Sequence, residues 1–182
     1  MSDIGVAAGL SRGAPGYFFG SKDDLYRAVL EAAFVDRQEA SERAVGPIRM
    51  WCEGTGGLEE LNEALTSAVD MYMEFLLARP AFVRLISWEE LAGGERLKDA
   101  ERKSDAISNA FGQVAKVSAD RGLANFDPED AVIVFIAMAY APVSLQNTFL
   151  AGIQMDLTKP RDRRRLRELA VGRLIDLITR AA

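Results

Sequence analysis

The chain has 182 residues, of which 49% are hydrophobic and 27% charged, and its net charge is −5. This composition belongs to a folded globular protein, and its acidic balance excludes a protein that coats nucleic acid non-specifically, so any DNA contact must be small and local. The absence of histidine and the single cysteine, Cys52, exclude Ser-His or Cys-His catalysis, a histidine-ligated metal site and an intrachain disulfide.

The first residues predict two short helices separated by a glycine. Ile4, Ala7 and Ala8 have the i, i+3, i+4 spacing of one helix face. Gly9 can end that helix because glycine adopts positive φ without steric cost. Ser11 then stands where it can cap a second helix. A short helix, a turn and a second helix form the geometry that places a recognition helix in a major groove.

A third helix is predicted from about Lys22 to Arg43. Gly20 breaks the preceding helix, and Ser21 provides a cap. The acids that follow Ser21 complement the helix dipole. We expect this helix to connect the DNA-reading corner to the rest of the chain and to transmit ligand binding.

The segment from Ile4 to Leu25 resembles the end of the DNA-binding domain of TetR-type transcriptional repressors and covers about a seventh of the chain. The matching positions are Ile4, Ala8, Gly9, Ser11, Gly13, Phe19, Ser21, Lys22 and Leu25. The resemblance implies a DNA-binding surface formed by Ser11, Arg12, Gly13, Ala14, Gly16, Tyr17 and Lys22. Within it, Arg12 and Tyr17 would contact the groove or phosphates, Ala14 would offer a methyl group to a thymine, and Lys22 would hold a phosphate. Phe19 and Leu25 are expected in the core.

Two departures from the family pattern affect this interpretation. The first helix of the family's three-helix domain, about 20–25 residues before Ile4, is missing, so we expect the chain as given to bind an operator poorly. Gly16 stands where a tyrosine is usual, and Pro15 lies inside a very short helix. The alternative is an all-α dimeric small-molecule-binding protein that does not bind DNA because its N-terminus is truly short.

The remainder is predicted to be helical throughout, which gives an all-α fold. We expect a partial helix-turn-helix domain over residues 1–45 and a helical effector-binding and dimerisation domain over 46–182, with a linker at Gly46-Pro47 and the glycines of 54–57. Asp127 caps a helix that Pro142 should kink. The expected helices after the linker cover 58–78, 80–93, 95–120, 130–150 and 162–181.

The resemblance also implies an effector pocket enclosed by the second domain. The expected ligand is an apolar or aromatic small molecule, because few polar anchors are apparent. The candidate lining residues are Met71, Tyr72, Phe75, Phe82, Trp88, Phe111, Phe135 and Met138. Any single one of these side chains is more often ordinary core, and a cavity of a few hundred cubic ångströms is expected between the helices that carry Phe75, Trp88, Phe111 and Met138.

The last two helices carry apolar stripes that are too wide to be covered from one side. We expect the second partner to be another copy of the chain, which agrees with the family's usual four-helix dimer interface. The predicted interface residues are Val143, Leu166, Ala170, Leu174, Leu177 and Ile178. The alternative is that both helices are buried in a large monomer core.

No enzymatic role is expected. Glu89 and Glu90 are adjacent, so on a helix they diverge by about 100° and form no carboxylate pair; we expect one to be solvated and one to pair with an arginine. No cofactor, metal or membrane span is predicted. The basic run at Arg161–Arg165 is interpreted as an exposed helix start, and the alternative is a second contact with nucleic acid or with an acidic partner. The predicted function is a cytoplasmic, ligand-responsive regulator that is released from a palindromic operator by a small effector.

Overall fold

The computed structural model describes residues 1–97, 106–123 and 126–179. No strand occurs among these described residues, which confirms the all-α fold class. The chain divides into an N-terminal unit, Met1–Arg37, and a C-terminal unit, Gln38–Ala182. The described elements are α1 (Ser2–Ala7), α2 (Ala14–Phe19), α3 (Lys22–Glu53), α4 (Leu58–Ala78), α5 (Pro80–Leu91), α7 (Ala106–Asp120), α8 (Pro128–Ser144), the π-helix η1 (Gln146–Leu150) and α9 (Pro160–Thr179).

The end of α1 has the geometry expected of a glycine-terminated helix. Gly9 has φ of 70°, and its N–H donates to the Val6 carbonyl at 3.0 Å. The Leu10 N–H donates to the Gly5 carbonyl at 2.8 Å. This pair of hydrogen bonds is the Schellman motif, which satisfies carbonyls that a helix end leaves without partners. The predicted role of Gly9 is therefore confirmed.

Helix α3 is longer than the sequence indicates. The predicted linker at Gly46-Pro47 is wrong, since α3 continues to Glu53 with Pro47 inside it. An interior proline costs about 3 kcal/mol because it lacks the N–H for the helical hydrogen bond. Burial of apolar side chains around it, at roughly 1.5–3 kcal/mol for each large one, outweighs this cost. The buried side chains are Ala44, Val45, Ile48 and Trp51.

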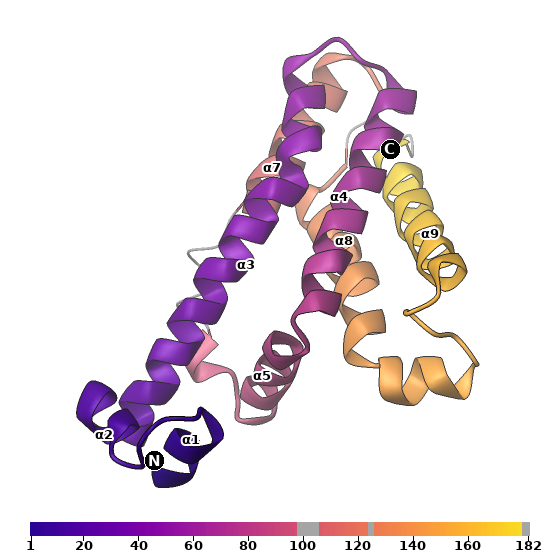
Figure 1. Ribbon diagram of the computed structural model, residues 1–182. Coiled ribbons are helices and arrows are strands. Elements are labelled where there is room, and N and C mark those ends of the chain that lie inside the picture. Colours follow the sequence, from indigo (N-terminus) through magenta and orange to yellow (C-terminus); the bar gives the residue numbers. More distant parts are fainter. Residues whose placement is uncertain (98–105, 124–125, 180–182) are drawn as a thin grey trace. The chain divides into compact units, whose positions relative to one another are not determined.

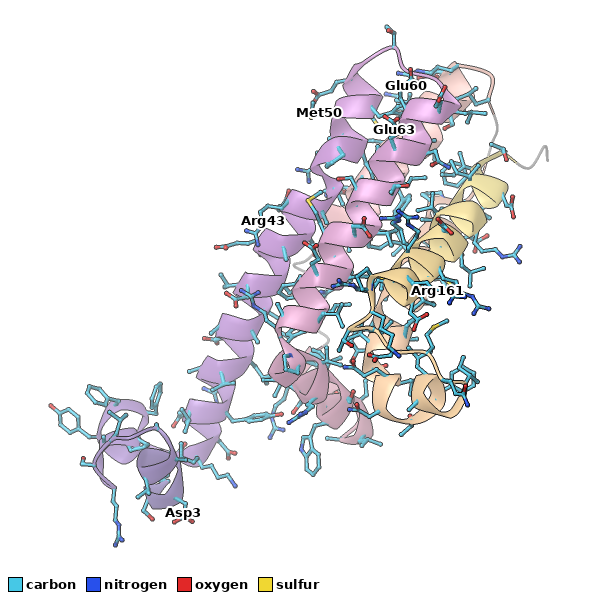
Figure 2. The ribbon with its side chains drawn as sticks, turned by 45° about the vertical axis from the view of Figure 1, so that its right-hand side comes forward. Asp3, Arg43, Met50, Glu60, Glu63 and Arg161 are labelled. Atoms are coloured by element: carbon cyan, nitrogen blue, oxygen red, sulfur yellow. The ribbon has the colours of Figure 1, made fainter. Side chains whose placement is uncertain are left out.

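The turn from Gly54 to Gly57 joins α3 to α4 and is clamped by Arg121, which follows α7. The Arg121 guanidinium donates to the Gly56 carbonyl at 2.7 Å and to the Gly54 carbonyl at 2.6 Å. It also lies over the Trp51 ring, 4.5 Å from the ring centroid. In turn, Trp51 Nε1 donates to the Gly57 carbonyl at 2.8 Å. Met50 and Glu60, labelled in Figure 2, mark the two sides of this turn.

Helices α4, α8 and α9 pack against one another in the C-terminal unit, and α7 packs against α8 (Figure 1). Helix α4 begins and ends where its sequence pattern predicts. Its buried side chains follow a helical spacing and include Leu61, Leu65, Val69, Tyr72 and Leu76. Packing of this apolar face provides most of a helix's stability in a folded protein.

Helix α8 begins as expected and ends earlier than expected. The Asp127 side chain caps it by accepting a hydrogen bond from the Glu129 N–H at 2.9 Å. It ends at Ser144, two residues after Pro142, and η1 replaces the expected continuation. The Leu150 N–H donates to the Leu145 carbonyl five residues earlier at 3.3 Å, which is the hydrogen bond of a π-turn.

The remaining helices lie close to their predicted bounds. Helix α7 forms the described end of the helix expected over 95–120, and residues 98–105 of that prediction lie outside the described residues. Helix α9 begins at Pro160 and is described to Thr179. No helix in the described part of the chain is both long and apolar enough to cross a membrane.

Candidate functional sites

Helices α1 and α2 of the N-terminal unit approach each other at Gly5. A Cβ atom at this position would lie 2.6 Å from the Ser11 carbonyl oxygen and 3.1 Å from Pro15 Cδ. Such distances are shorter than van der Waals contact, so only glycine fits without a shift of the backbone. The short helix, the turn and the second short helix are thus packed into one compact corner.

The second helix starts later than the sequence predicts. Its N-cap is Gly13, with no side-chain cap, so the predicted capping role of Ser11 is wrong. Ser11 contributes its backbone carbonyl, which accepts from the Ala14 N–H at 3.1 Å. The physical reason is Pro15, because a proline has no N–H to donate and is best placed in the first turn of a helix.

The DNA-binding residues predicted from the resemblance lie on or next to α2. Arg12, Tyr17 and Lys22 are exposed, and Tyr17 is 85% exposed with its ring 5.2 Å from that of Phe18 in an edge-to-face pair. Of the other predicted DNA-binding residues, Ser11 and Gly13 are exposed, and Ala14 and Gly16 are half-buried. These side chains are therefore available to a ligand outside the chain.

Two residues expected in the core of this corner are less buried than predicted. Phe19 is 41% exposed and Leu25 is half-buried. The described residues therefore leave part of the Phe19 ring uncovered. The prediction for Phe19 as a core residue is wrong.

The start of α3 is capped as predicted. Ser21 Oγ accepts from the Asp24 N–H at 3.1 Å and donates to Asp24 Oδ2 at 2.5 Å. The hydrogen bond from the Ser21 hydroxyl is the main cause that lowers the pKa of Asp24. The cap fixes the first turn of α3, where Lys22 lies, and a charged Asp24 at this end complements the helix dipole.

An aromatic cluster joins four helices of the C-terminal unit. Tyr72 of α4 and Phe111 of α7 both contact Phe135 of α8, with ring centroids 5.5 Å and 5.7 Å apart. Phe75 lies 6.2 Å from Tyr72 and 5.4 Å from Phe82 of α5. All five side chains are buried. The structure therefore brings together five of the eight side chains predicted to line an effector pocket.

The other three predicted pocket residues are not part of this aromatic cluster. Trp88 is 68% exposed on α5, so its prediction as a wall of an enclosed pocket is wrong. Met138 is half-buried and lines a groove between α8 and α9 instead, and Met71 is half-buried on α4. A helix buries only one stripe, and periodicity alone does not show which neighbouring helix each side chain faces. The cavity expected between the helices that carry Phe75, Trp88, Phe111 and Met138 stays a prediction.

Most predicted dimer residues lie in the core of a single chain. Val143, Leu166, Ala170, Leu174 and Ile178 are all buried, whereas Leu177 is half-buried. Leu174 and Ile178 have no exposed surface and Ala170 has 1%, so these three cannot contact a second copy and their assignment to a dimer interface is wrong. Val143 and Leu166 are 2% and 7% exposed and offer a second copy very little surface. The stripe on α9 is wide because α9 packs against both α4 and α8 of its own chain.

An apolar groove of about 420 Å³ lies elsewhere on α8 and α9. Ile133, which lines it, is 64% exposed. The other lining residues are Val134, Ala137, Met138, Arg173, Asp176 and Leu177. Arg173 and Asp176 form a 3.4 Å ion pair at its rim. Large exposed apolar patches of this kind are typical of surfaces that bind a partner.

The adjacent acids of α5 behave as expected. Glu89 is buried and lies 3.6 Å from the Arg96 guanidinium, whereas Glu90 is exposed. The prediction of one paired and one solvated carboxylate is confirmed. Within the described residues, no group of three or more Cys, Asp or Glu side chains is arranged to hold a metal ion.

In the residues that the structure describes, the fold is all-α, with two short helices joined by a turn in the N-terminal unit and an aromatic core in the larger helical unit. Residues 62–173 match the family model described as "Tetracyclin repressor-like, C-terminal domain", and this match covers more than half of the chain. The chain therefore belongs to the tetracyclin repressor-like family of ligand-responsive regulators. A search of curated proteins finds no relative that matches it.

Proposed function

We propose that this protein is a transcriptional regulator that represses its target by binding a palindromic DNA operator as a homodimer and leaves it when a small apolar effector binds. The observation that carries the proposal is the exposed set of Arg12, Tyr17 and Lys22 on a helix-turn-helix corner of a tetracyclin repressor-like chain. In this geometry the second helix enters the major groove, and residues at the start of the next helix reach the phosphates.

The effector site is proposed at the aromatic cluster of the C-terminal unit. Its rings come from α4, α5, α7 and α8, so a ligand inserted among them would change the packing of four helices at once. Tyr140 adds a half-buried hydroxyl near α5, 3.3 Å from the Val83 carbonyl and 3.4 Å from Ser87 Oγ. Burial raises the pKa of Tyr140, so at neutral pH its hydroxyl keeps the proton that it donates to Val83, and its oxygen can accept a hydrogen bond from a ligand. To act as a switch, the effector must bind more tightly to the form that has left DNA.

Loss of the Lys22 ammonium is expected to weaken DNA binding without changing sequence preference. Lys22→Ala should lower affinity for all sequences alike and reduce the slope of log affinity against log salt by about 1. Arg12→Ala should weaken binding and also relax specificity. The measurement is fluorescence anisotropy with DNA from the control region beside the gene, at several salt concentrations, for this chain and for one extended by the residues encoded upstream of Met1.

Lys116→Ala provides the matched control, since Lys116 is an exposed lysine on α7 of the C-terminal unit. It removes the same charge and should leave DNA affinity unchanged. Equal effects of Lys22→Ala and Lys116→Ala would reject the proposed phosphate contact. Absence of specific binding by both the given and the extended chain would favour a ligand-binding protein without DNA binding.

The dimer is proposed to form through the groove on α8 and α9. This surface carries one cation and one anion, so a two-fold copy of it is electrically complementary to itself. Ile133→Glu should convert a dimer of about 40 kDa into a monomer of 19.9 kDa in sedimentation equilibrium, because burying an unpaired carboxylate costs several kcal/mol.

Leu58→Glu serves as the control for this interface. Leu58 is an exposed apolar side chain of the same size as Ile133, but it lies at the start of α4, outside the groove. It should leave the dimer intact. A wild-type monomer at micromolar concentration, or equal dissociation by both variants, would contradict the proposed interface.

A further inference from the structure

A second hollow, of about 250 Å³, lies between α4 and α9, and the function proposed above does not use it. One face of each helix lines it with the same i, i+3, i+4, i+7 spacing. Helix α4 contributes Asp70, Met73, Glu74 and Leu77, and helix α9 contributes Pro160, Arg163, Arg164 and Arg167. The lining therefore combines arginines and acids with an apolar wall.

The charges of this hollow do not balance. Arg167 Nη1 lies 2.6 Å from Asp70 Oδ2, and this ion pair neutralises both side chains. Arg163, Arg164 and Glu74 remain, which leaves one positive charge in excess. Neither of the guanidinium groups of these two arginines has an ion-pair or hydrogen-bond partner among the residues that the structure describes.

The placement of these arginines is unfavourable for the helix itself. They lie in the first turns of α9, where the helix dipole is positive and repels cations. Arg161 and Arg165, on other faces of the same turns, add to the repulsion; Arg161 is labelled in Figure 2. A bound anion would relieve this repulsion, and a chain with a net charge of −5 has no general need for such a basic cluster.

The turn before α9 holds the arginines in place. Asp162 Oδ2 accepts from the Asp156 N–H at 2.9 Å, and Asp156 Oδ1 accepts from the Thr158 N–H at 2.9 Å. The first turn of α9 is therefore tied back to the segment that precedes it. Two arginines on a fixed turn lose less conformational entropy on binding than two on a free segment.

We propose that the hollow between α4 and α9 binds a small organic carboxylate, held by Arg163 and Arg164, with its apolar part on Met73 and Leu77. Arginine forms charge-assisted, often bidentate hydrogen bonds with carboxylates. The single excess charge favours a monoanion, because Glu74 repels a second negative charge such as that of a phosphate dianion. The volume is below the range of about 300–1,000 Å³ for drug-sized ligands, which favours a small molecule. This site is separate from the aromatic cluster and does not depend on DNA binding.

Benzoate is the probe for the test, and benzamide is its neutral analogue. The chain is labelled at its methionine methyl groups and titrated while NMR spectra are recorded. Benzoate should shift the Met73 methyl signal through its ring current and leave that of Met138 unchanged, and benzamide should bind at least tenfold more weakly. Equal binding of benzoate and benzamide, or stronger binding of inorganic phosphate, would overturn the assignment to a carboxylate.

Variants of matched charge distinguish a site from a general basic field. The double variant Arg163→Gln, Arg164→Gln should weaken benzoate binding at least tenfold. Arg161→Gln with Arg165→Gln, which removes the same charge from the same turns but outside the lining, should change it less than twofold. Equal losses in the two double variants would overturn the proposal, provided that both keep the wild-type circular dichroism spectrum and melting temperature.

A third comparison removes an acid instead of a base. Glu74→Gln should tighten benzoate binding severalfold, because it takes away the one unpaired negative charge in the hollow. Glu63→Gln on the same helix, labelled in Figure 2 and outside the lining, should not. Unchanged or weaker binding by Glu74→Gln would contradict the charge balance on which the monoanion assignment rests. These experiments use no DNA, so their outcome is independent of the proposed function.

Discussion

Replacing Phe135 with alanine is expected to lower the free energy of unfolding by about 4 kcal/mol, which is typical of a fully buried phenylalanine. Phe135 has no exposed surface. Its ring contacts Tyr72 of α4 and Phe111 of α7, so one substitution removes contacts between three helices. The alanine variant loses both the transfer free energy of the ring and the packing around the space that it leaves.

Urea unfolding followed by circular dichroism, at one fixed protein concentration, measures this effect. Phe149→Ala is the matched control, because Phe149 is the same residue type and is largely exposed on η1. It should change the free energy of unfolding by about 0.5 kcal/mol or less. If the two variants lose similar stability, the aromatic cluster is not the centre of the core.

Arg121→Ala is expected to lower the free energy of unfolding by about 3 kcal/mol. Hydrogen bonds to charged groups contribute about 1.5–3 kcal/mol each, and a cation–π contact about 0.5–2 kcal/mol. The guanidinium makes both kinds of contact with the turn between α3 and α4. We place the total loss of stability slightly below the sum of the lower limits, because one of the two hydrogen bonds is exposed to water. The same urea titration measures it.

Arg121→Lys tests whether the shape of the guanidinium matters beyond its charge. A lysine keeps the charge but cannot donate from two nitrogens in a planar fork while lying on the Trp51 ring, so it should recover less than half of the lost stability. Arg43→Ala is the control, because Arg43, labelled in Figure 2, makes an exposed 3.8 Å ion pair with Glu39 as its one ion pair among the described residues. That pair should be worth about 0.5 kcal/mol or less. Full recovery by lysine would contradict the clamp described here.

Local sequence signals predicted the helices well because their causes are local. The apolar stripe of α4 predicted the first and last residues of that helix, and the Asp127-Pro128 pair predicted where α8 begins. Gly9 and Ser21 were identified because each residue acts through atoms within five positions of itself. The corner that carries Arg12 and Lys22 could be predicted for the same reason.

Features that depend on distant residues could not be predicted. Pro47 remains inside α3 because the rest of the fold buries the side chains around it, such as Val45 and Ile48, and this outweighs its local cost. The contacts of Arg121 join positions 65 and 67 residues apart, and no spacing in the sequence indicates them. The width of the α9 stripe predicted two packing partners correctly, but it could not show that both belong to the same chain.

Position 5 tolerates no side chain, because the Ser11 carbonyl oxygen occupies the space that a Cβ atom would need. Its neighbours Ile4 and Val6 are exposed, whereas position 5 is buried and has no side chain to bury. In a library of all single substitutions, tolerance should therefore fall sharply at this one position and return on either side. A map of mutational tolerance would show an isolated intolerant site that hydrophobicity does not explain, and the Ser11 carbonyl opposite it is the reason.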